Sequence, residues 1–311
     1  ISSNTQNPDW GASILRDRCK VRGYVTSQKA EASGVSVGFD SVVSLIKIDQ
    51  LFVPGFDQNA SRPSYPALRQ LLARESTSKP RVLQQVYDWL EERRVGSSHI
   101  CRVTLSSGHP PAPSDMANVN QALARAIGDE PLGRDDVHEL IGLIHWQVFG
   151  WHAERASTLQ VLIDGEPGGP FGWRQPGWVE ELASTFRRFA NARFDLLVGC
   201  ESSRQAAGWI ATQCPNVSVT GSWRSDFSAT AIADFVAREV HRVPMVKLTG
   251  FASGASSAEW VYGKFQMARK AMASGFARLI EAGYFEEDEI PPILLAILHN
   301  TPRTLDPMIQ S

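Results

Sequence analysis

Two carboxylates and an arginine stand at corresponding places in the sequence, each shortly after a short apolar run typical of a strand. They are Asp164, Glu201 and Arg224. In a parallel β/α sheet such positions meet at one rim, so we expect the three side chains to surround a single mouth. Paired carboxylates can exchange protons, and a guanidinium can hold a carboxylate ligand. The alternative interpretation is that they form ordinary salt bridges on the rim.

Other polar residues follow strand-like runs and are candidates for the same mouth. His109, in the segment SSGHPPAPSD, is the histidine placed for chemistry. Trp223 beside Arg224 offers an aromatic wall and a cation, which suits a sugar acid or an aromatic acid, although a simple Trp lid explains it equally well. The further candidates for substrate binding are Gln28, Asp57, Glu166, Asp226 and Lys247, with Thr249 beside the last of them.

The remaining histidines fit packing better than catalysis. His145 and His152 are seven residues apart on one predicted helix face, and Trp146 and Trp151 flank them. This arrangement is more typical of a packed helix than of a ligand pair. His241 precedes a strand-like run, where residues of a barrel serve stability.

The strand-like runs alternate with longer stretches of helical period. Seven strands with intervening helices predict a parallel sheet, either open and doubly wound or closed into an eight-stranded barrel. No G-x-G-x-x-G turn follows a strand, which removes the main support for a dinucleotide-binding open sheet. The runs are Lys20–Val25, Val43–Phe52, His99–Leu105, Thr158–Ile163, Phe194–Gly199, Asn216–Gly221 and Val243–Leu248.

The predicted helices complete this pattern. Apolar stripes lie within residues 80–94, 178–189 and 232–240, and a last long helix opens with a capping-box pattern at Ser256 and Glu259 and ends near Gly283. We expect one β/α barrel domain over residues 1–311, with an extra helical insertion around 107–156.

Composition excludes several classes of function. The chain has 311 residues, a formal charge of −2 and 43% hydrophobic residues, enough for one large core. The near-neutral charge gives no reason to invoke nucleic acid, and no apolar run approaches the ~20 residues of a membrane helix. The four cysteines lack C-x-x-C spacing, so we expect reduced thiols and a cytoplasmic protein.

The tail from Lys247 resembles the end of bacterial uronate (glucuronate) isomerases, a branch of the amidohydrolase superfamily. It contains a strand, a long helix, the turn Glu281-Ala282-Gly283 and the stop His299-Asn300. Two further segments are similar to that family in the same order, WGASILRDRCKVRGYVTSQ and AERASTLQVLIDG. The resemblance implies a TIM-like (β/α)8 barrel whose first strand is missing from this sequence.

The resemblance also implies where a metal would bind. In that family a His-x-His pair, a middle-strand His and a last-strand Asp hold one divalent ion. Here the middle His falls on Leu162 and the Asp on Ala255, or on Gly250 or Ser253 with another gap placement, while the pair would lie upstream of Ile1. A catalytic site needs at least three N, O or S ligands, so we expect no such metal and no other cofactor.

Three loops of the family have also changed. Its Asp-Asp pair falls on Ser27-Gln28, and Asp57 is all that remains of its Trp-Arg-Pro-Asp loop. The Gly-x-Gly-Trp-Trp loop near the substrate has Arg224 in place of its second aromatic residue.

Three hypotheses follow. The first is metal-independent proton transfer, of isomerase or lyase type, on a small polar acid such as a sugar acid. The second is a catalytically silent relative that binds a metabolite or a partner protein. The third is a genuine glucuronate isomerase whose N-terminal part is missing here. For partners we expect a small-molecule ligand, no nucleic acid and no membrane, and either a homo-oligomer or a second chain that supplies the absent strand.

Overall fold

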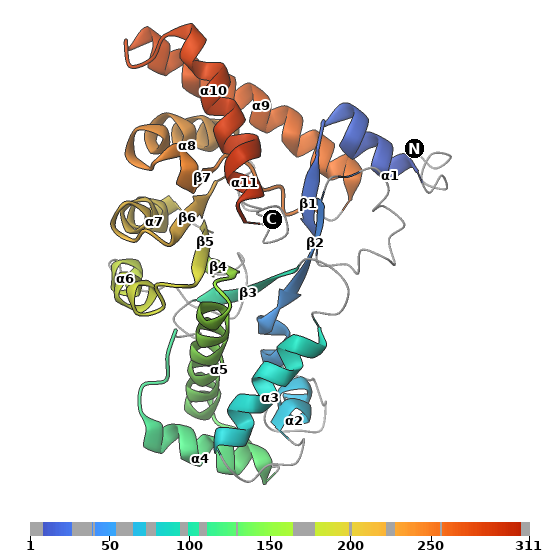
Figure 1. The fold of residues 1–311 in the computed structure, drawn as a ribbon, viewed down its shortest axis with the longest axis vertical. Coiled ribbons are helices and arrows are strands. Elements are labelled where there is room, and N and C mark those ends of the chain that lie inside the picture. Colours follow the sequence, from blue (N-terminus) through green and yellow to red (C-terminus); the bar gives the residue numbers. More distant parts are fainter. Residues whose placement is uncertain are drawn as a thin grey trace.

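The computed structural model describes residues 9–26, 39, 41–53, 65–72, 79–93, 99–105, 111–128, 130–163, 178–198, 201–221, 228–255 and 257–305. Within them the chain forms one seven-stranded sheet in which every strand pairs in parallel with the next strand of the sequence. The sheet curls into a half-barrel with helices outside (Figure 1). The strands are β1 (Gly23–Thr26), β2 (Ser41–Lys47), β3 (His99–Leu105), β4 (Thr158–Ile163), β5 (Arg193–Val198), β6 (Val217–Thr220) and β7 (Leu248–Thr249).

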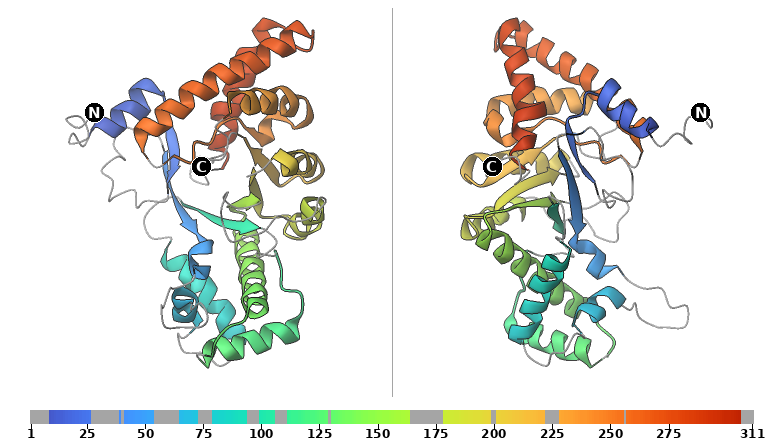
Figure 2. Two further views of the ribbon diagram at one scale, coloured as in Figure 1. Left: turned by 180° about the vertical axis from the view of Figure 1, so that it is seen from behind. Right: turned by 45° about the vertical axis from the view of Figure 1, so that its right-hand side comes forward.

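The helices cover the outer side of this sheet. Helices α6, α7 and α8 form a column beside β4 to β7, while α2 to α5 gather at one end of the molecule (Figures 1 and 2). The helices are α1 (Trp10–Ser13), α2 (Pro66–Leu72), α3 (Lys79–Glu92), α4 (Met116–Ile127), α5 (Arg134–Glu154), α6 (Trp178–Arg188), α7 (Glu201–Gln213), α8 (Ala229–Arg242), α9 (Ala258–Glu281), α10 (Ile290–Leu295) and α11 (Thr301–Arg303). None of the described helices is long and apolar enough to cross a membrane.

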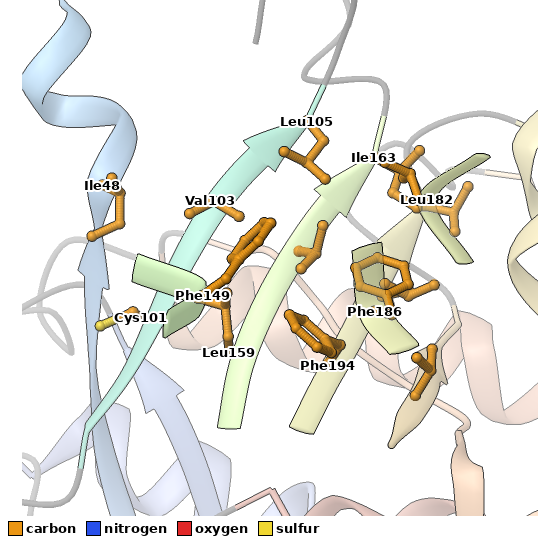
Figure 3. Close-up of a cluster of buried hydrophobic side chains, with 14 of the residues drawn as sticks. Ile48, Cys101, Val103, Leu105, Phe149, Leu159, Ile163, Leu182, Phe186 and Phe194 are labelled. Atoms are coloured by element: carbon orange, nitrogen blue, oxygen red, sulfur yellow. The ribbon is translucent and has the colours of Figure 1, made fainter. Parts of the chain in front are cut away.

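The main core lies between the sheet and the helices. Alternate residues of β4 and β5, such as Ile163 and Phe194, point to this outer side (Figure 3). The Phe194 ring centroid lies 5.6 Å from that of Phe149 on α5 and 4.6 Å from that of Phe186 on α6. Because strand side chains alternate, the other residues of each strand must face the inside of the half-barrel.

Most predicted strands are confirmed, and β3 and β4 have the predicted bounds. The prediction for the last strand was wrong. Residues 243–247 leave α8 through Pro244 and form the short 3-10 turn Met245–Lys247, so β7 begins only at Leu248. The start of α9 also differs by one residue: Ser257 is the N-cap, and its hydroxyl accepts from the Trp260 backbone amide.

The half-barrel has a gap between β1 and β7, and the helical layer bridges it. Helix α1 packs against the first turn of α9, and Trp10 Nε1 donates to Glu259 Oε1 at 2.8 Å. The edge of β7 is covered by the C-terminal segment. Thr249 O accepts from Gly221 N on the β6 side, so the Gly250 amide points to the free edge, where it donates to Ile297 O at 2.8 Å.

Candidate functional site at the carboxyl ends of the strands

The predicted rim residues follow strands that are neighbours in the sheet. Strands β4, β5 and β6 pair in register, so their carboxyl ends, which precede Asp164, Glu201 and Arg224 in the sequence, lie side by side. Glu201 is the first residue of α7, but its side chain lies outside the described residues. The other predicted rim residues outside the described part of the chain are Asp164, Arg224, His109, Gln28, Asp57, Glu166, Trp223 and Asp226.

Beneath this rim lies the last inward-facing residue of each strand from β3 to β7. In register across the sheet these are Thr104, Leu162, Leu197, Thr220 and Thr249, which we call the floor row. Leu162 and Leu197 are buried and pack with Ala252 in a cluster separate from the main core. The floor of the mouth is therefore apolar in the middle and carries hydroxyl groups on both sides.

Leu162 lies where the family resemblance places the middle metal-binding histidine. Its side chain packs against Leu197 and Ala252, and none of these side chains can ligate a cation. Nor do the described residues contain a cluster of three or more His, Cys, Asp or Glu side chains that could hold one. These residues do not fit the metal of that family, and no step below depends on one.

One layer deeper, the inward-facing residues are polar. Lys47, Arg102, Gln160, Asp195 and Ser218 follow one another in register, and we call them the polar layer. Its centre is the Asp195 carboxyl, which has no exposed surface.

Three donors from the two neighbouring strands β4 and β6 bind the Asp195 carboxyl. Gln160 Nε2 donates to Oδ2 at 3.0 Å, Thr220 Oγ1 donates to Oδ1 at 2.6 Å, and Ser218 Oγ lies 3.4 Å from Oδ1. Burial raises the pKa of Asp195 from 3.8 to about 6, and the three hydrogen bonds oppose that rise because they favour the carboxylate. Asp195 therefore titrates where a general acid or base is useful.

A second carboxylate binds across two strands near the rim. Asp49 lies in the 3-10 turn Ile48–Phe52 that follows β2. Its Oδ1 accepts from the Thr104 backbone amide at 2.9 Å, and its Oδ2 accepts from the Thr104 hydroxyl at 2.7 Å. The side chain thus extends the pairing of β2 with β3 and fixes one end of the floor row.

At the other end of the floor row, Thr249 has a hydroxyl oxygen that is buried and forms no hydrogen bond with the described residues. Its residue is 4% exposed and is adjacent in register to Thr220. Burial of a hydroxyl without a hydrogen-bond partner destabilises a protein by about 1–3 kcal/mol. A ligand that forms a hydrogen bond with Thr249 would remove this penalty and so bind more tightly.

Lys247 is not at the mouth, in contrast to the sequence prediction. It precedes β7, and its ammonium donates to Ala211 O and Cys214 O, each at 2.8 Å, at the carboxyl end of α7. Because α7 runs back from the rim, these carbonyls lie at the opposite end of the sheet. Burial lowers the pKa of the Lys247 ammonium. Lys247 serves as a helix C-cap.

His145 and His152 of α5 belong to the core, as predicted. His145 lies between the rings of Phe52 and Phe149, and His152 Nδ1 lies 2.7 Å from Ser157 Oγ. The described cysteines Cys19, Cys101 and Cys214 are buried and form no disulfide.

Sequence reasoning missed Asp195 and Asp49. Both stand alone within apolar strand-like runs, Phe194–Gly199 and Val43–Phe52. A single carboxylate within an apolar run could have indicated both residues. Such a side chain must either form hydrogen bonds inside the barrel or lie beyond the end of the strand.

Known structures share this architecture, although no protein-family model and no curated protein matches the chain. Uronate isomerase from Thermotoga maritima superposes with a TM-score of 0.72 at 14% identity, over 95% of this chain and 69% of that one. For uronate isomerase from Bacillus halodurans C-125 the TM-score is 0.65 at 13% identity, over 97% and 69% of the two chains. Glucuronate isomerase from Caulobacter crescentus gives 0.61 at 13% identity, over 94% and 65%.

The fold is that of the uronate isomerases. The resemblance predicted from the tail and the two upstream segments is therefore confirmed at the level of the fold. The TIM-like architecture with one strand fewer than eight is confirmed for the described residues as well.

Proposed function

We propose that this protein performs metal-independent proton transfer, of isomerase or lyase type, on a small polar acid bound at the mouth of the half-barrel. The observation that carries the proposal is the apolar floor of Leu162, Leu197 and Ala252 within a uronate isomerase fold. The fold favours a sugar acid as ligand, and the floor offers hydrophobic contact where the resemblance places a cation. Proton transfer must then rely on side chains alone.

The proposal assigns roles to the rim. Asp164 and Glu201 exchange protons with the ligand, Arg224 pairs with its carboxylate, and His109 assists at the β3 side. Gln28, Asp57, Glu166, Trp223 and Asp226 are proposed to complete the binding surface. The in-register pairing of β4, β5 and β6 supports this assignment, because it brings the carboxyl ends of these three strands together. A cytoplasmic location belongs to the same proposal and is supported by the described thiols.

Solvent exchange of carbon-bound hydrogen tests the reaction directly. The protein, treated with a chelator, is incubated with D-glucuronate, D-galacturonate and related hydroxy acids in deuterium oxide, and proton NMR follows deuterium incorporation. We expect exchange by the wild type, a loss of about 10²-fold or more in E201Q, and binding weakened about tenfold or more in R224A. R278A, which removes an exposed ion pair with Asp234 between α8 and α9, is the control.

The outcomes separate the hypotheses. Binding without exchange would favour the silent relative. Stoichiometric zinc or manganese in the purified protein, with exchange that chelation abolishes, would favour a genuine glucuronate isomerase. Exchange and binding unchanged in both E201Q and R224A would overturn the proposed site.

A further inference from the structure

Thr220 connects the floor row with the polar layer. Its residue lies in the floor row beside Leu197 and is 4% exposed. Its hydroxyl nevertheless points one layer down and donates to Asp195 Oδ1 at 2.6 Å. A hydroxyl has one donor and two acceptor positions, so the same oxygen can accept a hydrogen bond from a group above the floor.

Asp195 is arranged to exchange a proton through this hydroxyl. The carboxyl is fully buried, so a ligand in the mouth cannot touch it directly. Gln160 holds its other oxygen at 3.0 Å, which fixes the orientation of the carboxyl toward Thr220. The charged residues of the same layer, Lys47 and Arg102, lie on the far side of Gln160. Burial is the main reason for its raised pKa.

Thr249 supplies the second half of the arrangement. It is adjacent to Thr220 in register, faces the same interior and has a buried hydroxyl that forms no hydrogen bond with the described residues. Two neighbouring strands therefore present two hydroxyl groups at one side of the apolar floor. Of these two hydroxyls, the one of Thr220 donates its proton to Asp195, whereas the one of Thr249 donates to no described residue.

We propose that Thr220 and Asp195 form a proton relay beneath the mouth, which accepts the proton of a ligand hydroxyl that Thr249 helps to bind. The inference rests on the proposed function and names its substrate class, an acid with a hydroxyl next to the carbon that loses its hydrogen. Thr220 contacts the ligand, and Asp195 is a positioning residue that acts through Thr220.

The step is balanced without a further reactant. The ligand O–H bond breaks as Thr220 Oγ1 takes that proton, and the electron pair of the bond stays on the ligand oxygen. At the same time the original Thr220 proton passes to Asp195 Oδ1, so the carboxylate becomes a carboxylic acid. The reverse transfer returns the proton to the product.

Substitution of Thr220 separates a relay from a structural role. T220S keeps the hydroxyl. T220V removes it and keeps the shape of the side chain, whereas T220A removes both. D195N removes the proton acceptor. T212V is the matched control, because Thr212 lies at the exposed end of α7 and its hydroxyl bonds to Trp209 O. Each variant is assayed for deuterium exchange between pH 4.5 and 8 and for D-glucuronate affinity by calorimetry.

We expect wild-type exchange to rise with pH through an inflection near 6, where Asp195 becomes able to accept a proton. T220S and T212V should keep both the rate, within about fivefold, and the inflection. T220V, T220A and D195N should lose about 10²–10⁴-fold in rate and lose the inflection, while affinity changes less than tenfold. Circular dichroism verifies that each variant is folded.

Two results would overturn the inference. Exchange and inflection retained in a folded T220V or T220A would refute the relay and leave the proposed function intact. Absence of exchange in the wild type with every acid of the panel would instead refute the proposed function and the relay with it.

Discussion

Asp195 shows how the surroundings of one residue determine its chemistry. The strand that carries it is otherwise apolar from Phe194 to Val198, and the carboxyl is accommodated because Gln160, Ser218 and Thr220 direct donors at it. An isolated buried carboxylate would be far more costly. The same burial that makes the group expensive also raises its pKa into the range of proton transfer.

The raised pKa makes stability depend on pH. In the unfolded chain Asp195 has a pKa of 3.8 and loses its proton above that pH, whereas in the folded chain it keeps the proton until about pH 6. Asp195 should therefore stabilise the protein less as pH rises through that window, by about 3 kcal/mol in total. The free energy of unfolding of D195N, measured in urea relative to that of the wild type, should be higher at pH 7.5 than at pH 4.5. D234N, which removes an exposed carboxylate on α8, is the control, and a difference independent of pH would contradict the expectation.

At the scale of elements, α8 packs closely against the chain at the end of β6. Gly221 follows β6, and a Cβ there would lie 2.0 Å from Phe235 Cε1 on α8. No side chain other than hydrogen fits at this position without movement of the ring.

We predict that G221A destabilises the protein by about 1–3 kcal/mol because it overpacks this contact. The cost should shrink in an F235L background, where the ring that causes the clash is gone. A double-mutant cycle in urea measures the coupling. Equal costs in the two backgrounds would place the strain elsewhere.

Gly263 offers the opposite case within α9. It lies in the helix interior, is exposed, and a Cβ there would meet no atom within 4 Å. G263A should therefore stabilise the protein by about 0.5–1 kcal/mol, since alanine loses less backbone entropy on folding. The measurement is the urea midpoint at unchanged slope. A lower midpoint would indicate that the glycine has a role beyond the helix.

At the scale of the whole molecule, the two edges of the sheet differ in how far other segments cover them. The edge of β7 is covered by the C-terminal segment, in which Ile293, Ile297 and Thr301 are buried and the Thr301 hydroxyl donates to Met245 O at 2.7 Å. The outer strand β1 has alternating exposed and half-buried residues. An uncovered edge is a template for further pairing, so this covering protects the sheet.

G250P should loosen the C-terminal segment because it removes the amide that donates to Ile297 O and crowds a position where a Cβ would already be 3.1 Å from Ile297. We expect faster hydrogen–deuterium exchange across residues 290–303 with little change in α8. T301V, which removes the bond to Met245 O, should act on the same segment. Uniformly faster exchange over the whole chain would indicate general destabilisation instead.

The amino-acid sequence by itself determined the architecture and its likeness to the uronate isomerases. Short apolar runs that alternate with longer stretches of helical period show which segments are strands, and this is why β3 and β4 were predicted with their observed bounds. The replacement of a metal-binding histidine by Leu162 was also visible without a structure, because ligation depends on residue type.

Only the tertiary structure decided which polar residues meet. Alternation shows that Asp195 and Leu196 face opposite sides but not which side is the interior. The register of the strands places Thr220 beside Thr249 and within hydrogen-bond distance of Asp195. Lys247 was misplaced because a proline and a short turn shifted the start of β7. Contacts between strands far apart in the chain arise from packing of the whole sheet, and local sequence patterns carry no information about them.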